Sequence, residues 1–206
     1  AVLAGTVGII RAVDTGRDRR PPPADDPWAG YEVFERTATI GPFTIAERFD
    51  VALASLASRR GREADVAKAA EGAGIPLPGP GRAVDGVLYG AFWLAADQWM
   101  IEAPFENHED IVARLKPVFG DAASITEQTD AWVRFDIRAG RLAPLVERLC
   151  NVDLPSAPAG FASRTVIEHL GCYLIKRGDG EVTLYGPRSS AASLLHALEV
   201  AARSVH

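Results

Sequence analysis

The sequence predicts an α+β protein made of two ferredoxin-like β-α-β-β-α halves behind an N-terminal extension. Residues 54–79 and 133–158 both have the pattern of a strand, an Arg-x-Gly-Arg sequence, a helix and a short apolar segment that contains Leu-Pro. Residues 97–115 and 180–198 both have the pattern of a short strand that ends in proline before a helix. Because the order agrees at a period of about eighty residues, we infer a duplicated supersecondary unit.

The first half is expected to cover residues 44–129 and the second half residues 130–206. In the first half we expect a strand at 44–58, a helix at 62–72, a hairpin at 87–103, a helix at 107–116 and a strand at 124–128. In the second half we expect a strand at 131–138, a helix at 142–150, an extended segment at 163–177, a strand at 181–186 and a helix at 190–204. The second half therefore repeats all but the last strand of the first.

Two of the helices are predicted from apolar stripes with helical spacing. The residues of these stripes are Leu142, Leu145, Val146 and Leu149 in one helix, and Leu194, Leu195, Leu198, Ala202 and Val205 in the other. Pro144 is compatible with the first of these helices only near its start.

Residues 1–43 form an N-terminal extension that lies outside the repeat. Its charged, proline-rich stretch RDRRPPPADDP (17–27) predicts an exposed connector. Four aromatic residues follow, namely Trp28, Tyr31, Phe34 and Phe43. We expect this aromatic segment to dock, either on its own domain or on a partner protein.

Composition excludes several classes of function. The chain has 206 residues, a net charge of -5 and a sequence pI near 5.4, so nucleic acid is not expected as a partner. The apolar start AVLAGTVGII is too short for a membrane helix and lacks the charged region of a signal peptide. Cys150 and Cys172 form neither a CxxC motif nor a disulfide framework, which favours a reducing compartment and a cytoplasmic location.

The stretch GAFWLAADQWMIEAP (90–104) is predicted to be a hairpin with its turn at residues 95–97, by analogy with Gly178–Gly180 in the second half. Alternation along its second strand defines two faces. One face carries Trp99 and Ile101, and the other carries Gln98, Met100 and Glu102.

Trp93 and Trp99 in this hairpin raise the question of a binding site. We interpret the indoles as buried packing groups and Asp97 as a residue that satisfies turn amides. The alternative is a ligand-binding wall in which the hairpin stacks on a bound ring.

No constellation of side chains in this sequence predicts chemistry of its own. His169 and Cys172 lie three residues apart in an extended segment, where their side chains need not converge, and no second pair completes a metal site. His108 lies in NHED, where Asn107 is expected to cap a helix with Glu109 and Asp110 near its positive end.

The remaining motifs have structural interpretations as well. The glycines of EGAGIPLPGPG (71–81) open no helix, so neither a phosphate loop nor a dinucleotide fingerprint is present. Ser189 and Ser190 precede a helix and suit capping better than nucleophilic attack.

Three carboxylates remain as candidates for hydrogen bonds to a pteridine ring, because they lie near strand or loop ends. They are Asp97, Glu102 and Asp153, and their spacing singles out no pair for acid-base work. We therefore expect no catalytic, cofactor-binding or metal-binding residue in this chain.

From about Ala46 onward, the sequence resembles the gamma subunit of heterotetrameric sarcosine oxidase. The pieces that carry the resemblance are, in order, LASLASRRGRE, IPLPGPGR, FWLAADQW, TDAWVRFDIRAG, CNVDLP, ASRTVIEHLGCYLI and GPRSSAASLLHAL. One departure is Ala95 and Ala96, where the family usually has Gly-Pro, and the extension to Phe43 is unmatched.

The resemblance implies a fold like the folate-binding domain of aminomethyltransferase. It also implies a non-catalytic subunit with a structural and assembly role, whose partners are alpha, beta and delta subunits. The family complex oxidatively demethylates sarcosine and passes the one-carbon unit to tetrahydrofolate. FAD, FMN, NAD, tetrahydrofolate and zinc are expected in the other subunits, and no cofactor in this chain. Two alternatives stay open: a stand-alone pterin- or folate-binding protein, and a subunit of a sister complex such as an N-methylglutamate dehydrogenase.

Overall fold

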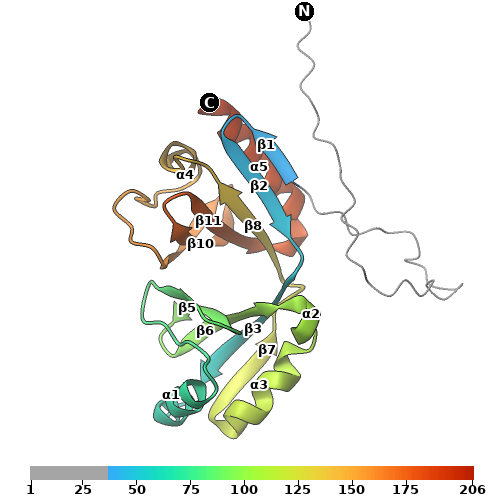
Figure 1. The fold of residues 1–206 in the computed structure, drawn as a ribbon, viewed down its shortest axis with the longest axis vertical. Helices are drawn as coiled ribbons and strands as arrows, with labels where there is room; N and C mark the ends of the chain where they lie inside the picture. The colour runs from blue at the N-terminus through green and yellow to red at the C-terminus, as the bar shows by residue number, and fades with distance from the viewer. Residues whose placement is uncertain (1–36) are drawn as a thin grey trace, which may run out of the picture.

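The computed structural model describes residues 37–206, which form two antiparallel sheets packed face to face with helices on their outer sides (Figure 1). The six-stranded sheet has the order β1 (Thr37–Ile40), β2 (Phe43–Arg48), β8 (Trp132–Arg138), β11 (Glu181–Pro187), β10 (Leu170–Gly178), β9 (Phe161–Ile167). The five-stranded sheet has the order β4 (Ala83–Asp85), β5 (Gly90–Ala95), β6 (Gln98–Pro104), β3 (Val51–Ser58), β7 (Ala123–Glu127).

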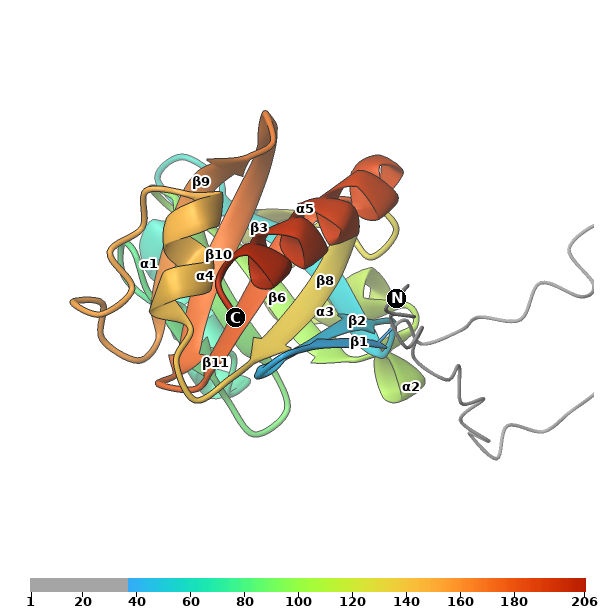
Figure 2. The same ribbon diagram turned by 90° about the horizontal axis from the view of Figure 1, so that it is seen from above.

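The helices are α1 (Glu63–Gly72), α2 (Phe105–His108), α3 (Ile111–Phe119), α4 (Ala143–Leu149) and α5 (Ala191–Ser204), with short 3-10 turns η1 (Gly120–Ala122) and η2 (Arg188–Ser190). Viewed from above, α4 and α5 lie across the strands of the six-stranded sheet (Figure 2). None of the helices in residues 37–206 has the length and apolar character needed to span a bilayer. The α+β class with two similar halves is confirmed.

Three apolar cores fill the spaces between these layers. One lies between the six-stranded sheet and the helices α4 and α5, and it buries the predicted stripes, with Leu145, Leu194 and Leu198 fully inaccessible. A second lies between the five-stranded sheet and α1 and α3. The third, which we call the inter-sheet layer, is made of Leu53, Ala83, Phe92, Met100, Ala162, Ile175 and Tyr185.

The predicted single strand at 44–58 is wrong, because the chain forms two strands that lie in different sheets. In β2 the buried side chains are at odd positions, such as Phe43 and Ile45, whereas in β3 they include the even positions Ala52 and Ala54. This change of phase means that one flat strand cannot bury both sets on one face. The chain therefore leaves the six-stranded sheet at residues 49–50 and enters the five-stranded sheet.

One strand of the first half, β2, lies in the sheet of the second half. β7 pairs with β3, with Ile125 opposite Leu56, and β2 pairs with β8 in the equivalent register, with Ile45 opposite Ile137. The strand that the second half lacks in sequence is thus supplied by β2, from the N-terminal side of the first half.

The predicted extended segment at 163–177 is in fact a hairpin, β9–β10. Its turn consists of Glu168 and His169, which have φ values of 48° and 67°. Neither residue is a glycine or an asparagine, the residues that usually mark such a turn, so the sequence carried little signal for it. The three-residue strand β4 was also too short to be predicted.

The predicted helix at 107–116 is two helices, and its predicted cap is wrong. Asn107 lies inside α2, and the side chain that caps α3 is Asp110, which accepts a hydrogen bond from the Ala113 amide at 3.1 Å. Ser190 occupies the N-cap position of α5 but makes no side-chain capping bond. Pro144 lies in the first turn of α4, as predicted.

The edges of the two sheets meet at a reciprocal backbone bridge between Arg82 and Phe161. The Ala83 amide donates to the Gly160 carbonyl at 2.7 Å, and the Ala162 amide donates to the Gly81 carbonyl at 2.8 Å. Both glycines are left-handed, with φ values of 68° for Gly81 and 72° for Gly160. The bridge thus relates the two halves as if by a two-fold axis.

Replacing Gly160 is expected to open this bridge. A Cβ atom there would lie 2.8 Å from the Ala83 carbonyl oxygen, in addition to the strain of a left-handed backbone. Gly160→Ala should lower the free energy of unfolding, measured in urea, by about 3 kcal/mol or more. Gly74→Ala is the control, because Gly74 is also left-handed but a Cβ there meets nothing within 4 Å, so it should cost about 1 kcal/mol. If the two variants lose the same free energy of unfolding, the bridge does not contribute to stability.

Candidate functional site

The largest gathering of polar side chains lies between the two sheets, at Glu102 of β6. Three donors from the six-stranded sheet reach its carboxylate. The Tyr185 hydroxyl donates to Oε1, Arg177 Nη2 donates to both oxygens at 2.7 and 3.0 Å, and Arg134 Nη1 lies 3.6 Å from Oε1. The Glu102 side chain is only 6% exposed. One carboxylate of the five-stranded sheet is therefore held by three groups of the other sheet.

The ionic contacts continue outward from both arginines. Arg134 donates to both carboxylate oxygens of Asp136, at 2.9 and 3.1 Å, and the Thr183 hydroxyl donates to the same aspartate at 2.8 Å. Arg177 donates to Asp85 at 2.5 Å. Negative and positive groups therefore alternate along a row. We call this row the inter-sheet charge cluster, and its charged members are Asp85, Arg177, Glu102, Arg134 and Asp136.

Electrostatics keep the three donors around Glu102 protonated. Burial raises the pKa of the Tyr185 phenol well above its usual value, and the neighbouring Glu102 charge raises it further, so Tyr185 remains a donor. Burial acts to lower the pKa of Arg134, but interactions with Tyr185 and Glu102 raise it by more. The pKa of Arg177 is raised for the same reason, chiefly by Glu102.

Aromatic packing adjoins this cluster at Tyr185. The Phe92 ring stacks on Tyr185 with 5.3 Å between ring centroids and also contacts Tyr173 at 5.4 Å. The Trp132 ring meets Tyr173 edge-on at 5.5 Å. Because the Glu102 carboxylate is buried and already occupied by donors of the other sheet, the arrangement serves to bind one sheet to the other.

The three predicted carboxylates are not brought together. Asp97 lies at the β5–β6 turn, five residues along β6 from Glu102, which is roughly 16 Å in an extended strand. Asp153 lies in the loop after α4, where its carboxylate accepts a hydrogen bond from the Ser156 amide at 3.3 Å. Within residues 37–206, no hydrogen bond or ion pair joins any two of the three.

The tryptophan hairpin follows the predicted alternation. Trp99 and Ile101 face the core beneath α1 and α3, while Met100 faces the inter-sheet layer. The indole N–H of Trp99 donates to the Pro78 carbonyl at 2.8 Å, so packing and a hydrogen bond both hold this ring. Trp93 lies opposite Trp99 in the register and is half-buried. The interpretation of Trp99 as a packing group is confirmed.

The histidine and cysteine candidates are also separated. His169 is exposed in the β9–β10 turn, whereas Cys172 is fully buried, and burial raises the pKa of its thiol to about 11. His108 is buried, with Nδ1 3.0 Å from the Pro104 carbonyl and its ring edge-on to Tyr89. In the part of the chain that the structure describes, no three His, Cys, Asp or Glu side chains gather where they could hold a metal ion.

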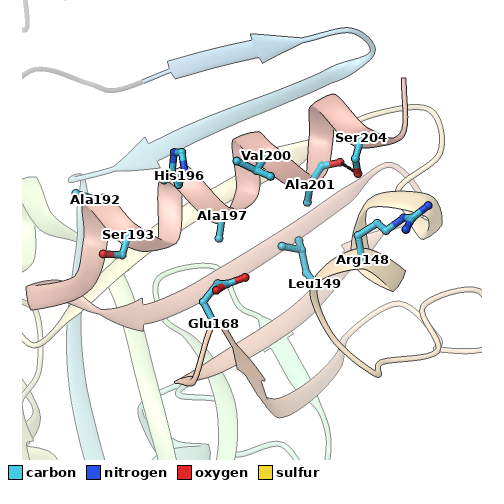
Figure 3. Close-up of a pocket in the computed structure, with 10 residues that line it drawn as sticks. All are labelled: Arg148, Leu149, Glu168, Ala192, Ser193, His196, Ala197, Val200, Ala201 and Ser204. Carbon is cyan, nitrogen blue, oxygen red and sulfur yellow. Dashed lines mark hydrogen bonds between the residues drawn. The ribbon is translucent and has the colours of Figure 1, made fainter.

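The outer surface of residues 37–206 includes two hollows of note. The larger, about 790 Å³, is an open groove between α4, α5 and the β9–β10 turn (Figure 3). Leu149, Ala197, Val200 and Ala201 supply apolar surface there, and Arg148, Glu168 and His196 supply polar groups. The smaller hollow, about 430 Å³, lies beside β7 and is lined by Arg59, Lys116, Gly120, Asp121, Ala123, Ser124 and Ile125.

Most of the charge cluster could not be identified from the sequence. In β8, Arg134 and Asp136 alternate with the buried residues Val133, Phe135 and Ile137. Such alternation normally indicates a solvated face. A second signal was present in Tyr185, which stands in the repeat at the position of Glu102, but it does not reveal that the two side chains touch.

Comparisons with known proteins agree on the fold. No protein-family model and no curated protein sequence matches this chain. Among solved structures, it is similar to a chain of the heterotetrameric sarcosine oxidase from Corynebacterium sp. U-96, with a TM-score of 0.70 and 19% identity over 82% of this chain and 87% of that one. It is also similar to the glycine cleavage system aminomethyltransferase T from Bartonella henselae, with a TM-score of 0.54 and 14% identity over 74% of this chain.

These likenesses confirm the resemblance to both proteins at the level of the fold. The chain spans 46% of the aminomethyltransferase, which is the larger protein. The matched sarcosine oxidase chain is of similar length to this one, since each is covered over more than four fifths.

The Glu102 carboxylate is expected to be essential for stability. Glu102→Gln removes the buried charge that Arg134 and Arg177 share and leaves each arginine with only its outer partner, Asp136 or Asp85. Breaking a buried ion pair in this way typically costs about 3 kcal/mol or more. The control is Glu181→Gln, which removes the partner of the exposed Arg138 and should cost at most about 1 kcal/mol. Urea unfolding monitored by circular dichroism measures both. Similar values for the two variants would show that the cluster does not bind the sheets together.

Proposed function

We propose that this chain is a non-catalytic gamma-type subunit of a sarcosine oxidase-like heterotetrameric flavoenzyme complex. The observation that carries the proposal is the likeness over most of both chains to a similarly sized chain of the Corynebacterium enzyme. In such a complex, the reaction is oxidative demethylation of sarcosine with transfer of the one-carbon unit to tetrahydrofolate. The chain is thereby part of an oxidoreductase without an active site of its own.

A structural role is supported by the contacts of Glu102, which join the two sheets. The donors that surround Glu102 all belong to the opposite sheet. The carboxylate therefore makes its hydrogen bonds and ion pairs within the protein. A rigid pair of sheets with a large open groove on one helical face is suited to holding other subunits in a fixed geometry.

The remaining parts of the proposal concern the rest of the assembly. We assign FAD, FMN, NAD, tetrahydrofolate and zinc to the alpha, beta and delta partners and no cofactor to this chain. We place the complex in the cytoplasm, which suits the two cysteines, both present as free thiols.

Isolation of the native assembly tests the proposal. The chain, tagged in its native host, should copurify in fixed stoichiometry with larger chains that carry flavin absorbance and oxidise sarcosine. Oxygen consumption with sarcosine and with other N-methyl amino acids measures the substrate preference. Preference for N-methylglutamate would favour the sister dehydrogenase complex. A monodisperse free monomer in the native extract would contradict the subunit role.

Titration with tetrahydrofolate tests the alternative of a pterin-binding protein. Since Trp99 is engaged with Pro78 and the core, the tryptophan fluorescence of the isolated full chain should show no saturable change. Aminomethyltransferase T serves as the positive control for ligand quality. A saturable quench that disappears in Trp93→Phe would favour the hairpin as a pterin site instead.

A further inference from the structure

The duplicated architecture leaves one sheet edge covered and its counterpart open. In the six-stranded sheet, β2 is covered by β1, with Ala38 opposite Ile45. In the five-stranded sheet, β7 takes the place of β2 but is the last strand, and no strand of residues 37–206 pairs with its outer side. The two strands are otherwise equivalent, because Ile125 and Ile45 lie opposite equivalent residues of β3 and β8.

The open edge presents unpaired backbone groups. The Arg59 amide bonds to the Ala122 carbonyl and the Gln128 amide bonds to the Leu53 carbonyl, which sets the phase of the β3–β7 ladder. In that phase Ser124 and Thr126 bond to β3, and the amides and carbonyls of Ala123, Ile125 and Glu127 point away from it. The register runs without a bulge, so this edge is regular enough to accept another strand.

The residues of β7 are less buried than their counterparts in β2. Ile45 in the covered strand is fully inaccessible, whereas Ile125 in the open strand is only half-buried. Ser124 and Thr126 are exposed, while their counterparts Thr44 and Ala46 are half-buried. A strand added to β7 would bring these residues to the burial seen in the other half.

The side chains around this edge indicate the charge of the added segment. Arg59 and Lys116 line the hollow beside β7, and Asp121 is the one acidic residue in its lining, which leaves an excess of positive charge. No salt bridge within residues 37–206 involves Arg59 or Lys116.

We propose that the outer edge of β7 binds an extended, acidic segment of a partner chain, which adds to the five-stranded sheet as β1 adds to the six-stranded sheet. Backbone hydrogen bonds from Ala123, Ile125 and Glu127 hold the segment. Arg59 and Lys116 select a carboxylate near the start of β7. This inference rests on the proposed function, since it assigns one contact surface of the subunit.

A site-specific photocrosslinker tests the edge in the full chain within its native host. Ser124 is replaced by p-benzoylphenylalanine, and crosslinked peptides are identified by mass spectrometry. The matched control is the same replacement at Thr44, which lies between Thr39 of β1 and Arg138 of β8 and must therefore crosslink within its own chain. We expect the Ser124 reporter to capture an acidic peptide of a different chain.

Charge reversal completes the test. Arg59→Glu together with Lys116→Glu should lower the yield of that crosslink about tenfold, because like charges then face each other. Arg141→Glu, an exposed reversal in the second half, should change the yield less than about twofold.

Several outcomes overturn the proposal. Capture of residues 1–36 of the same chain, capture of β7 from a second copy, or absence of any crosslink from an assembled complex would each do so, and each leaves the subunit role intact. A crosslink yield that is unchanged by the charge reversal overturns the preference of this edge for an acidic segment. A chain that purifies alone, with no partner at all, overturns both this inference and the proposed function.

Discussion

The structure depends on the contact between the Glu102 carboxylate of one sheet and Arg134, Arg177 and Tyr185 of the other. Removing these ions from water is costly, and the cost is offset only while every charge keeps its partner. The aromatic residues of the inter-sheet layer tolerate small displacements, but hydrogen bonds to a single carboxylate do not. The cluster therefore determines how the sheets are placed on each other, while apolar burial supplies most of the attraction between them.

Much of the fold follows from local patterns in the sequence. The apolar stripe that contains Leu194 and Leu198 predicted α5, and the Gly178–Gly180 turn predicted the β10–β11 hairpin. The placement of β2 in the sheet of the second half was not predicted, because pairing between strands far apart in the chain leaves no local trace. The one available signal was the change of buried phase between Ile45 and Ala52. The β9–β10 hairpin was not predicted, because its left-handed turn is formed by Glu168 and His169 and lacks the glycine or asparagine that usually marks a hairpin turn.

The candidate site was predicted less completely than the fold. Alternation along β6 correctly separated Trp99 from Met100, because a strand has only two faces. Alternation does not reveal whether a polar face meets water or another sheet, so Arg134 was not recognised as a buried partner of Glu102, nor Asp136 as a buried partner of Arg134. Their role depends on tertiary packing, which brings together strands about thirty to eighty residues apart.

The placement of β2 in the sheet of the second half has a consequence for synthesis on the ribosome. Its pairing partner β8 emerges roughly ninety residues later, since Thr44 pairs with Arg138. At typical elongation rates of about 5–20 residues per second, Phe43 and Ile45 remain without their sheet for several seconds or longer. The nascent chain therefore exposes an apolar strand during translation, and the six-stranded sheet closes only after the second half has left the exit tunnel.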